Sequence, residues 1–380
     1  MSYCNFPKLV TEDPKDRFRR ATFRVLWTLL TFAVTVGVVR VSPAAAQQWK
    51  KVVAEAKREG KVVVAGPSGA VYRPALIQAF QKEFPEIQVE YNSFRPGRFK
   101  TRIIAERRAK KKLWDVHING MPGPVSLKRA GVLVDLRPVF RPDIKRDRNW
   151  QGGFNFGFVD DKKMYNYGFF GELQTVVYAN RTFMPSSKFN NPRQLIDPEF
   201  RGKIVVGDPR RFGAGLARMA AIMSAFGEDF VRKLFTTQQM VYTSNRRQVV
   251  EWLINGRYPI AIGVAESALY EYVKQGVGKD VKPVISFEVS VWSTATGNIS
   301  LIDSAPHPNA AKLYINWILS KRAQELLAKD SNHNSRRTDI DPVRPENFPD
   351  PKRLKQYTRN DENWRATQLK VRKLAKKLIK

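Results

Sequence analysis

Cysteine is almost absent from this 380-residue sequence, and histidine occurs only three times. The single cysteine, Cys4, lies near the N-terminus, so disulfides and thiolate-bound metals are excluded from the rest of the chain. His117, His307 and His333 are widely separated, and neither a Gly-x-Ser-x-Gly nor a His-Glu-x-x-His motif occurs. We therefore expect a protein that is not an enzyme and that holds no cofactor or resident metal.

Acidic residues are scarce relative to basic ones. The chain has 66 Lys and Arg against 35 Asp and Glu, a formal net charge of +31. The first 46 residues hold seven basic and three acidic side chains, so the remainder keeps +27. Such a balance fits nucleic acid, an acidic outer-membrane surface, or anionic solutes steered toward a cleft. Zinc-finger spacing, RNP-type motifs and long uninterrupted basic tracts are all missing, so no nucleic-acid partner is expected.

A membrane-spanning apolar run is also missing. The apolar run at 25–39 has 15 residues and three threonines, short of the roughly 20 that a spanning helix needs. Four arginines precede it and Ala44-Ala45-Ala46 follows, which is typical of a secretory signal. We predict a signal peptide at 1–46 and a mature chain from Gln47. Arg19-Arg20 leaves Sec and twin-arginine export both open, and Cys4 precedes the run, which excludes a lipoprotein anchor.

The remainder alternates helical patterns with short apolar runs, which is typical of an α/β protein with parallel strands, and its length predicts two lobes. Strands that cross between the lobes are predicted at 175–178 and 297–303. Helices are predicted at 49–59, 75–84, 99–111, from 214, and at 248–254, 268–275 and 305–329. Further strands are predicted at 61–65, 87–91, 114–118, 204–206 and 258–264, and the tail from 364 is basic and amphipathic.

Nine segments, in order, resemble the periplasmic solute-binding proteins of ATP-driven importers, in the group related to ferric-iron binding proteins. They are WKKVVAEAKREGKVVVAGP, FQKEFPEIQVEY, WDVHIN, GVLVDLRP, TVVYANRTF, DPEFRGKIVVGDPRRFGAGLARMAAI, FGEDFVRKL, LINGRYPIAIG and APHPNAAKLYINWILSKRAQELLAK. The resemblance covers nearly all of residues 47–340.

The resemblance implies a type II periplasmic-binding-protein fold, in which two α/β lobes close on a ligand in the cleft between them. It places lobe 1 at 47–175 and 297–340, lobe 2 at 176–296, and a C-terminal tail at 341–380 that packs on the lobes. It also implies a periplasmic, monomeric protein that delivers a small solute to ABC permease subunits.

The segment GDPRRFGAGLARM, at 207–219, joins a strand to a helix. Helix N-termini attract anions, and Arg210 or Arg211 adds a donor suited to a carboxylate, phosphonate or phosphate. The segment is not a P-loop, because five residues separate Gly207 from Gly213, and Ala214-Gly215 replaces Lys-Ser/Thr. We predict that Gly213 and one of the two arginines contact an anionic ligand; the alternative is solvated arginine.

Three other loops follow strands and should face the cleft, since open α/β sheets bind ligands at the carboxyl ends of their strands. One carries Ser68, Gly69 and Tyr72, which could equally form a glycine turn with a helix cap. Another carries Asn119 and Gly120, where an ordinary Asn-Gly turn is the alternative. The last carries Glu266 and Ser267.

The chain departs from the iron binders, which place adjacent tyrosines in that last region. Here Tyr270 and Tyr272 are separated by one residue, and on a helix they point about 200° apart. Ser68-Gly69 also stands where those proteins carry a histidine ligand. Iron ligation is therefore not expected, and carboxylate–tyrosine or anion-assisted ferric binding remains the alternative. More distant alternatives are a secreted basic nucleic-acid binder and an enzyme on this fold.

Overall fold

A computed structural model of the chain describes residues 43–67, 72–94 and 98–379. The predicted signal peptide, with Cys4 and Arg19-Arg20, lies almost wholly outside the described residues. Its last residues are an exception, because helix α1 (Pro43–Glu59) begins six residues before the predicted start at Trp49. The predicted cleavage site after Ala46 therefore falls within the first turn of α1.

The first of three sheets has the strand order β2-β1-β3-β12-β4. Its strand β1 pairs in parallel with β2 and β3, whereas β12 runs antiparallel to β3 and β4. The strands are β1 (Lys61–Pro67), β2 (Gln88–Phe94), β3 (Val116–Asn119), β4 (Tyr167–Gly168) and β12 (Asn298–Leu301). Its helices are α1, a π-helical turn (Ala75–Ala79) that continues into α2 (Phe80–Glu83), α3 (Arg98–Arg108), α4 (Pro122–Arg129), α8 (Pro308–Ile318) and α9 (Lys321–Ser331). The single helix predicted over 305–329 is thus two helices, because α8 ends at Ile318 and Ser320 caps α9.

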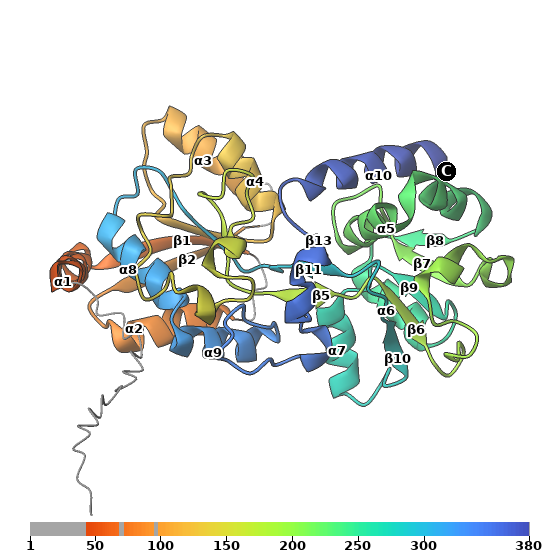
Figure 1. Cartoon of the computed structure of the whole chain (residues 1–380). Coiled ribbons are helices and arrows are strands. Elements are labelled where there is room, and N and C mark those ends of the chain that lie inside the picture. Colours follow the sequence, from red (N-terminus) through yellow and green to blue (C-terminus); the bar gives the residue numbers. More distant parts are fainter. Residues whose placement is uncertain (1–42, 68–71, 95–97, 380) are drawn as a thin grey trace, which may run out of the picture. The chain divides into compact units, whose positions relative to one another are not determined.

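The second sheet has the order β10-β6-β9-β7-β8. Strand β7 pairs in parallel with β8 and β9, and β6 runs antiparallel to β9 and β10. The strands are β6 (Val177–Asn180), β7 (Ile204–Gly207), β8 (Val241–Thr243), β9 (Ile260–Ile262) and β10 (Val281–Val284); the helices are α5 (Ala214–Thr237), α6 (Arg246–Ile254), α7 (Glu266–Lys274) and α10 (Trp364–Leu378). Figure 1 shows α5 and α10 side by side, and their apolar residues share one hydrophobic cluster.

The chain passes between these sheets through a small third sheet, of order β13-β11-β5. Strands β5 (Glu172–Gln174) and β11 (Val291–Ser293) are antiparallel, and β13 (Thr358–Arg359) adds to β11 in parallel. The positions predicted for the crossing strands, 175–178 and 297–303, are therefore wrong. Val177 and Tyr178 belong to β6 and Asn298–Leu301 is β12, each inside a large sheet. Their apolar residues made them conspicuous, whereas the true crossing strands are short and partly polar.

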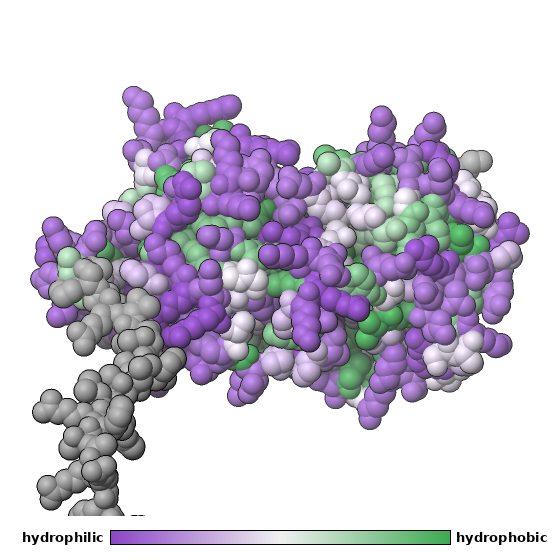
Figure 2. Space-filling model, in the orientation of Figure 1, coloured by the Kyte–Doolittle hydropathy of each residue, from purple (hydrophilic) through white to green (hydrophobic). Residues whose placement is uncertain are grey.

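Each large sheet is covered by apolar side chains in its own main cluster, as the continuous apolar runs of parallel strands require. The chain thus forms a mixed α/β fold of two lobes; the boundaries predicted for the lobes remain a prediction. Short 3-10 turns occupy Asp147–Asn149, Phe154–Gly157, Pro192–Ile196, Pro198–Phe200, Pro345–Asn347 and Pro351–Gln356. The face in Figure 2 is mainly hydrophilic, with small hydrophobic areas. Across the described ranges, no helix has the length and apolarity to cross a membrane.

Candidate ligand-binding site

Of the predicted loop after β1, only Tyr72 can be placed. Ser68 and Gly69 lie outside the described residues. The side chain of Tyr72 is buried, and its hydroxyl donates to the carbonyl oxygen of Thr296 at 3.2 Å, with the Oγ1 atom of Thr296 at 3.1 Å. Burial raises the pKa of Tyr72 above its ordinary value, so the hydroxyl stays protonated at neutral pH. Tyr72 therefore already has a polar partner within the fold.

The predicted loop after β3 forms a local turn. The Oδ1 atom of Asn119 accepts a hydrogen bond from the backbone N–H of Gly120 at 2.8 Å. The carbonyl oxygen of Asn119 accepts another from the side-chain amide of Asn298 at 2.9 Å. Both of these hydrogen bonds are internal to the fold, and a contact of Asn119 and Gly120 with a ligand stays a prediction.

The arginines of the strand-to-helix segment have different surroundings. Arg210 folds back on Asp208, with its Nε and Nη2 atoms 2.9 and 3.1 Å from the two carboxylate oxygens. Although burial raises the pKa of Asp208, the hydrogen bond from Arg210 brings it below its ordinary value. Arg211 is exposed, and no hydrogen bond or ion pair of its side chain is found among the described residues. Arg211 is thus the member of the pair available to a ligand.

A hollow of about 240 Å³ lies where β7 and β8 end and helices α5 and α6 begin. Glycine is required at its base, since a Cβ on Gly215 would lie 1.7 Å from the carbonyl oxygen of Gly207. No side chain caps the N-terminus of α5 at Gly213, which leaves first-turn N–H groups for another acceptor. The hollow is lined by Gly207, Asp208, Arg211, Phe212, Gly213, Ala214, Gly215, Thr243, Ser244, Arg246, Val249 and Gly263.

The charges around this hollow favour an anion. Arg211 and Arg246 are exposed cations in its lining, and its one carboxylate, Asp208, is held by Arg210. The N-termini of α5 and α6 carry partial positive charge and make the electrostatic potential of the hollow more positive. The chemistry available here is multidentate hydrogen bonding to a carboxylate, phosphonate or phosphate group.

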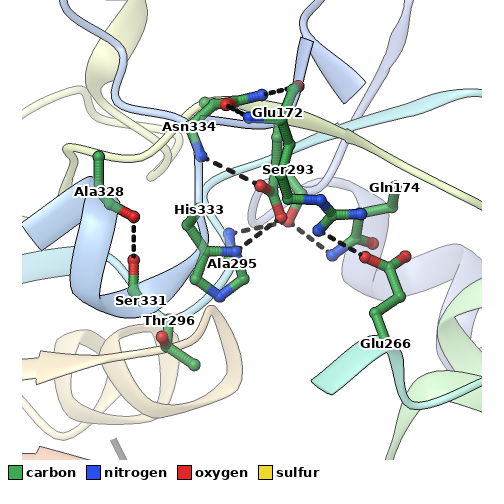
Figure 3. A network of polar contacts seen from close by, with 12 residues as sticks. Glu172, Gln174, Glu266, Ser293, Ala295, Thr296, Ala328, Ser331, His333 and Asn334 are labelled. Atoms are coloured by element: carbon green, nitrogen blue, oxygen red, sulfur yellow. Dashed lines mark hydrogen bonds and ion pairs between the residues drawn. The ribbon is translucent and has the colours of Figure 1, made fainter. Parts of the chain in front are cut away.

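Glu172 is the centre of a buried polar network shown in Figure 3. The Nδ1 atom of His333 lies 2.9 Å from one carboxylate oxygen of Glu172, and the backbone N–H of Asn334 donates to the other at 3.3 Å. Burial raises the pKa of Glu172, but the lowering by His333 and Arg344 is larger. The pKa of Glu172 therefore lies below its ordinary value. Glu172 is therefore ionised at neutral pH.

Glu266, which the sequence did predict as a ligand contact, lies in a second part of the network. Its Oε2 atom accepts from Arg344 at 2.8 Å. Its Oε1 atom is buried, accepts no hydrogen bond from the described residues, and lies 3.6 Å from Nη2 of Arg218. Arg218 is held in turn by the carbonyl oxygen of Thr175 at 2.8 Å. The Oε1 atom of Glu266 is thus ion-paired with Arg218 but accepts no hydrogen bond from the described residues. Ser267 follows it in α7, and its side chain lies outside the described part of the chain.

Beside the network is a cavity of about 570 Å³, a size typical of ligand pockets. Its lining brings helix α7 together with residues that follow α9. Tyr270 lines it, whereas the hydroxyl of Tyr272 donates to Glu251 at 2.6 Å, so the two tyrosines do not face one site. The lining is Tyr178, Glu266, Leu269, Tyr270, Glu271, Val273, Lys274, Asp330, Ser331, Asn332, His333, Val343, Arg344 and Glu346.

Sequence reasoning missed His333, Arg344, Glu172 and Arg218 as members of this region. His333 and Arg344 lie in irregular chain after α9, where no periodicity marks a site. Arg218 offered the one usable signal, since it is a charged residue within the most apolar part of α5. Among the described residues, no group of three or more His, Cys, Asp or Glu side chains could hold a metal ion.

Comparisons with known proteins agree with the fold. The family described as bacterial extracellular solute-binding protein matches residues 66–325. Iron-bound HitA from Pseudomonas aeruginosa is similar, with a TM-score of 0.65 and 15% identity over 84% of this chain and 99% of HitA. The Mannheimia haemolytica ferric iron-binding protein A, in an open conformation, has a TM-score of 0.64 and 15% identity over 84% and 98% of the two chains.

Two further relatives add detail. The Trichodesmium protein IdiA (FutA), in complex with iron and citrate, has a TM-score of 0.65 and 13% identity over 84% of this chain and 99% of its own. A Haemophilus influenzae protein of uncharacterised function is 25% identical over 181 residues, which are 46% of this chain and 50% of that protein. The match therefore spans half the length of that curated relative.

Proposed function

The chain belongs to the bacterial extracellular solute-binding protein family, and we propose that it captures a small anionic solute for an ABC permease in the inner membrane. It is exported, acts as a monomer in the periplasm, and binds its solute without chemical turnover. The observation that carries the anion proposal is the hollow at the start of α5, where Arg211 and Arg246 accompany uncapped helix N–H groups.

The carboxylate nearest to the hollow is already paired. Arg210 neutralises Asp208, so the charge left at the hollow is positive. A bound carboxylate or phosphonate would receive N–H groups from α5 and a planar guanidinium from Arg211. Such charge-assisted contacts are stronger than neutral hydrogen bonds, and they strengthen further when a closing cleft excludes water.

A ferric chelate is the second candidate, favoured by the iron and citrate ligands bound to the Trichodesmium protein. Among the described residues, no group of three or more His, Cys, Asp or Glu side chains could hold a metal ion, which favours a chelate over bare iron. An anionic chelate such as ferric citrate brings its own carboxylates. It would be recognised at the hollow as an anion.

A thermal-shift screen tests the anion proposal, with ferric citrate, phosphonates, carboxylates, sulfonates and polyamines as ligands. A true ligand at a hundredfold excess over Kd adds about 2.7 kcal/mol of stability and is recovered unchanged. Arg211→Gln and Arg246→Gln should each weaken binding by about 30-fold or more. Arg247→Gln is the matched control, since Arg247 is exposed, neighbours Arg246 and does not line the hollow.

Two results would overturn the proposal. One is that only cations such as polyamines stabilise the protein. The other is that the Arg211 and Arg246 variants bind as tightly as the Arg247 control. Export is tested separately by mass spectrometry of a periplasmic extract, where we expect an N-terminus within a few residues of Gln47. Recovery of the uncleaved chain in the cytoplasm would contradict export.

A further inference from the structure

A second cavity, of about 480 Å³, lies within the first lobe and shares no lining residue with the hollow or the cavity described above. It is formed by α1, the end of α2, α8, the start of α9 and the loop at 141–149. Helices α1 and α8 pack against each other (Figure 1). Its lining is Trp49, Val53, Glu83, Phe84, Arg141, Asp143, Ile144, Arg146, Asn149, Leu313, Asn316, Trp317, Ser320, Lys321 and Arg337.

The interior of this cavity is aromatic. Trp317 is 5% exposed, packs against Phe80 with ring centroids 5.2 Å apart, and donates its indole N–H to Glu83 at 3.1 Å. Trp49 is half-buried on α1, and the guanidinium of Arg141 lies 4.9 Å from its ring centroid. Phe84 completes the aromatic wall. These rings provide an apolar surface for a flat or hydrocarbon group.

The rim of the cavity carries four cations and two carboxylates, and the carboxylates are already engaged. The carboxylate of Asp143 accepts hydrogen bonds from Nε and Nη2 of Arg141, both at 2.9 Å. Glu83 accepts from Trp317. Arg337 donates to Asp339 and to the carbonyl oxygen of Leu319, so this cation is also satisfied.

Two cations of the rim, Lys321 and Arg146, can still donate hydrogen bonds to a ligand. The Nζ atom of Lys321 lies 3.8 Å from a carboxylate oxygen of Glu325, which is a long ion pair, and both side chains are half exposed. The Nε atom of Arg146 is buried and has no hydrogen-bond partner among the described residues. A guanidinium without a partner is a ready donor, so an acidic ligand group that reaches Arg146 would supply the missing acceptor.

We propose that this cavity is a second binding site, specific for amphipathic organic anions. The apolar part of such a ligand lies against Trp49, Phe84 and Trp317, and its carboxylate or sulfonate group accepts from Arg146 and Lys321. The volume of the cavity is within the range of pockets that hold small organic molecules. The site binds independently of the anion hollow in the second lobe.

The test uses the purified full-length mature protein and the aromatic monosulfonate 8-anilinonaphthalene-1-sulfonate, titrated by fluorescence. Arg146→Gln should raise the Kd of the probe by about 10-fold or more, because it removes the charged donor. Lys321→Gln should raise it by about threefold. Arg148→Gln is the matched control, because Arg148 is an exposed arginine of the same loop outside the lining; its Kd should stay within about twofold of wild type.

Equal effects of Arg146→Gln and Arg148→Gln would overturn the proposal, since the probe would then be responding to surface charge. Circular dichroism establishes that each variant is folded. If Arg146→Gln does not fold, the Kd of the probe for Lys321→Gln decides the test. Arg211→Gln must leave the affinity for the probe unchanged. Loss of binding in that variant would place the probe at the hollow and also overturn the proposal.

Discussion

The Nδ1 atom of His333 lies 2.9 Å from Oε1 of Glu172, whose carboxylate is 3% exposed. Burial lowers the pKa of His333, but the charge of Glu172 and its hydrogen bond raise it more, and the net pKa lies above the ordinary 6.5. Arg344 lowers the same pKa and Glu266 raises it. The pair therefore links the region after α9 to strand β5 in a pH-dependent manner.

We predict that the stabilisation from this pair is largest near pH 5.5 and declines as pH rises. A histidine whose pKa is raised on folding stabilises fully below its unfolded pKa, about 6.5, and loses that contribution through the folded pKa. Glu172, whose pKa is lowered, stabilises above its unfolded value of 4.5. The Tm difference between wild type and His333→Gln should therefore shrink from pH 5.5 to pH 9. A constant difference would contradict this.

A second prediction concerns Arg344 and Glu266, which are 13% and 19% exposed and 2.8 Å apart. Arg344→Gln should lower the free energy of unfolding by about 2–4 kcal/mol, because it leaves the Glu266 carboxylate without its nearest cation. Urea denaturation measures this loss. The control is Arg193→Gln, which breaks a pair that is 57% and 42% exposed and should cost less than about 1 kcal/mol. Equal losses would contradict the prediction.

A third prediction is that alanine destabilises the fold at Gly215 but not at Gly213, two glycines of the same segment. A Cβ on Gly215 would lie 1.7 Å from the carbonyl oxygen of Gly207, whereas one on Gly213 would meet nothing within 4 Å. Gly213 has an extended backbone that alanine also adopts. Gly215→Ala should therefore destabilise the fold by about 3 kcal/mol or more, since backbone must move. Gly213→Ala should change the Tm little, and the reverse order would contradict the close approach.

The sequence predicted the alternation of helices and strands because apolar periodicity is a local property. The strand and the helix that the 207–219 segment was predicted to join both appear, as β7 and α5. The crossing strands were misplaced, since β5 and β11 have three residues each and include Glu172 and Ser293. Three residues with mixed polarity give no usable period.

The candidate site was predicted less completely, because side-chain partners depend on long-range packing. Arg210 and Arg211 are adjacent in sequence, yet Asp208 holds only Arg210. Glu266 was selected from its place after a strand, but its partner Arg344 is 78 residues away. No spacing rule connects such positions, and only the folded chain brings them together.

The last prediction concerns helix α10, whose buried residues pack against α5 in one cluster. Leu374 is 7% exposed, and Trp364 donates its indole N–H to Ser224 of α5 at 3.2 Å. Leu374→Ala should lower the free energy of unfolding by about 2–4 kcal/mol, because the cavity it leaves adds to the lost apolar burial. Lys373→Ala, at the adjacent exposed position, should change it by less than about 0.5 kcal/mol. If both substitutions leave urea unfolding unchanged, α10 does not pack on α5 in solution, and the C-terminal segment contributes nothing to the second lobe.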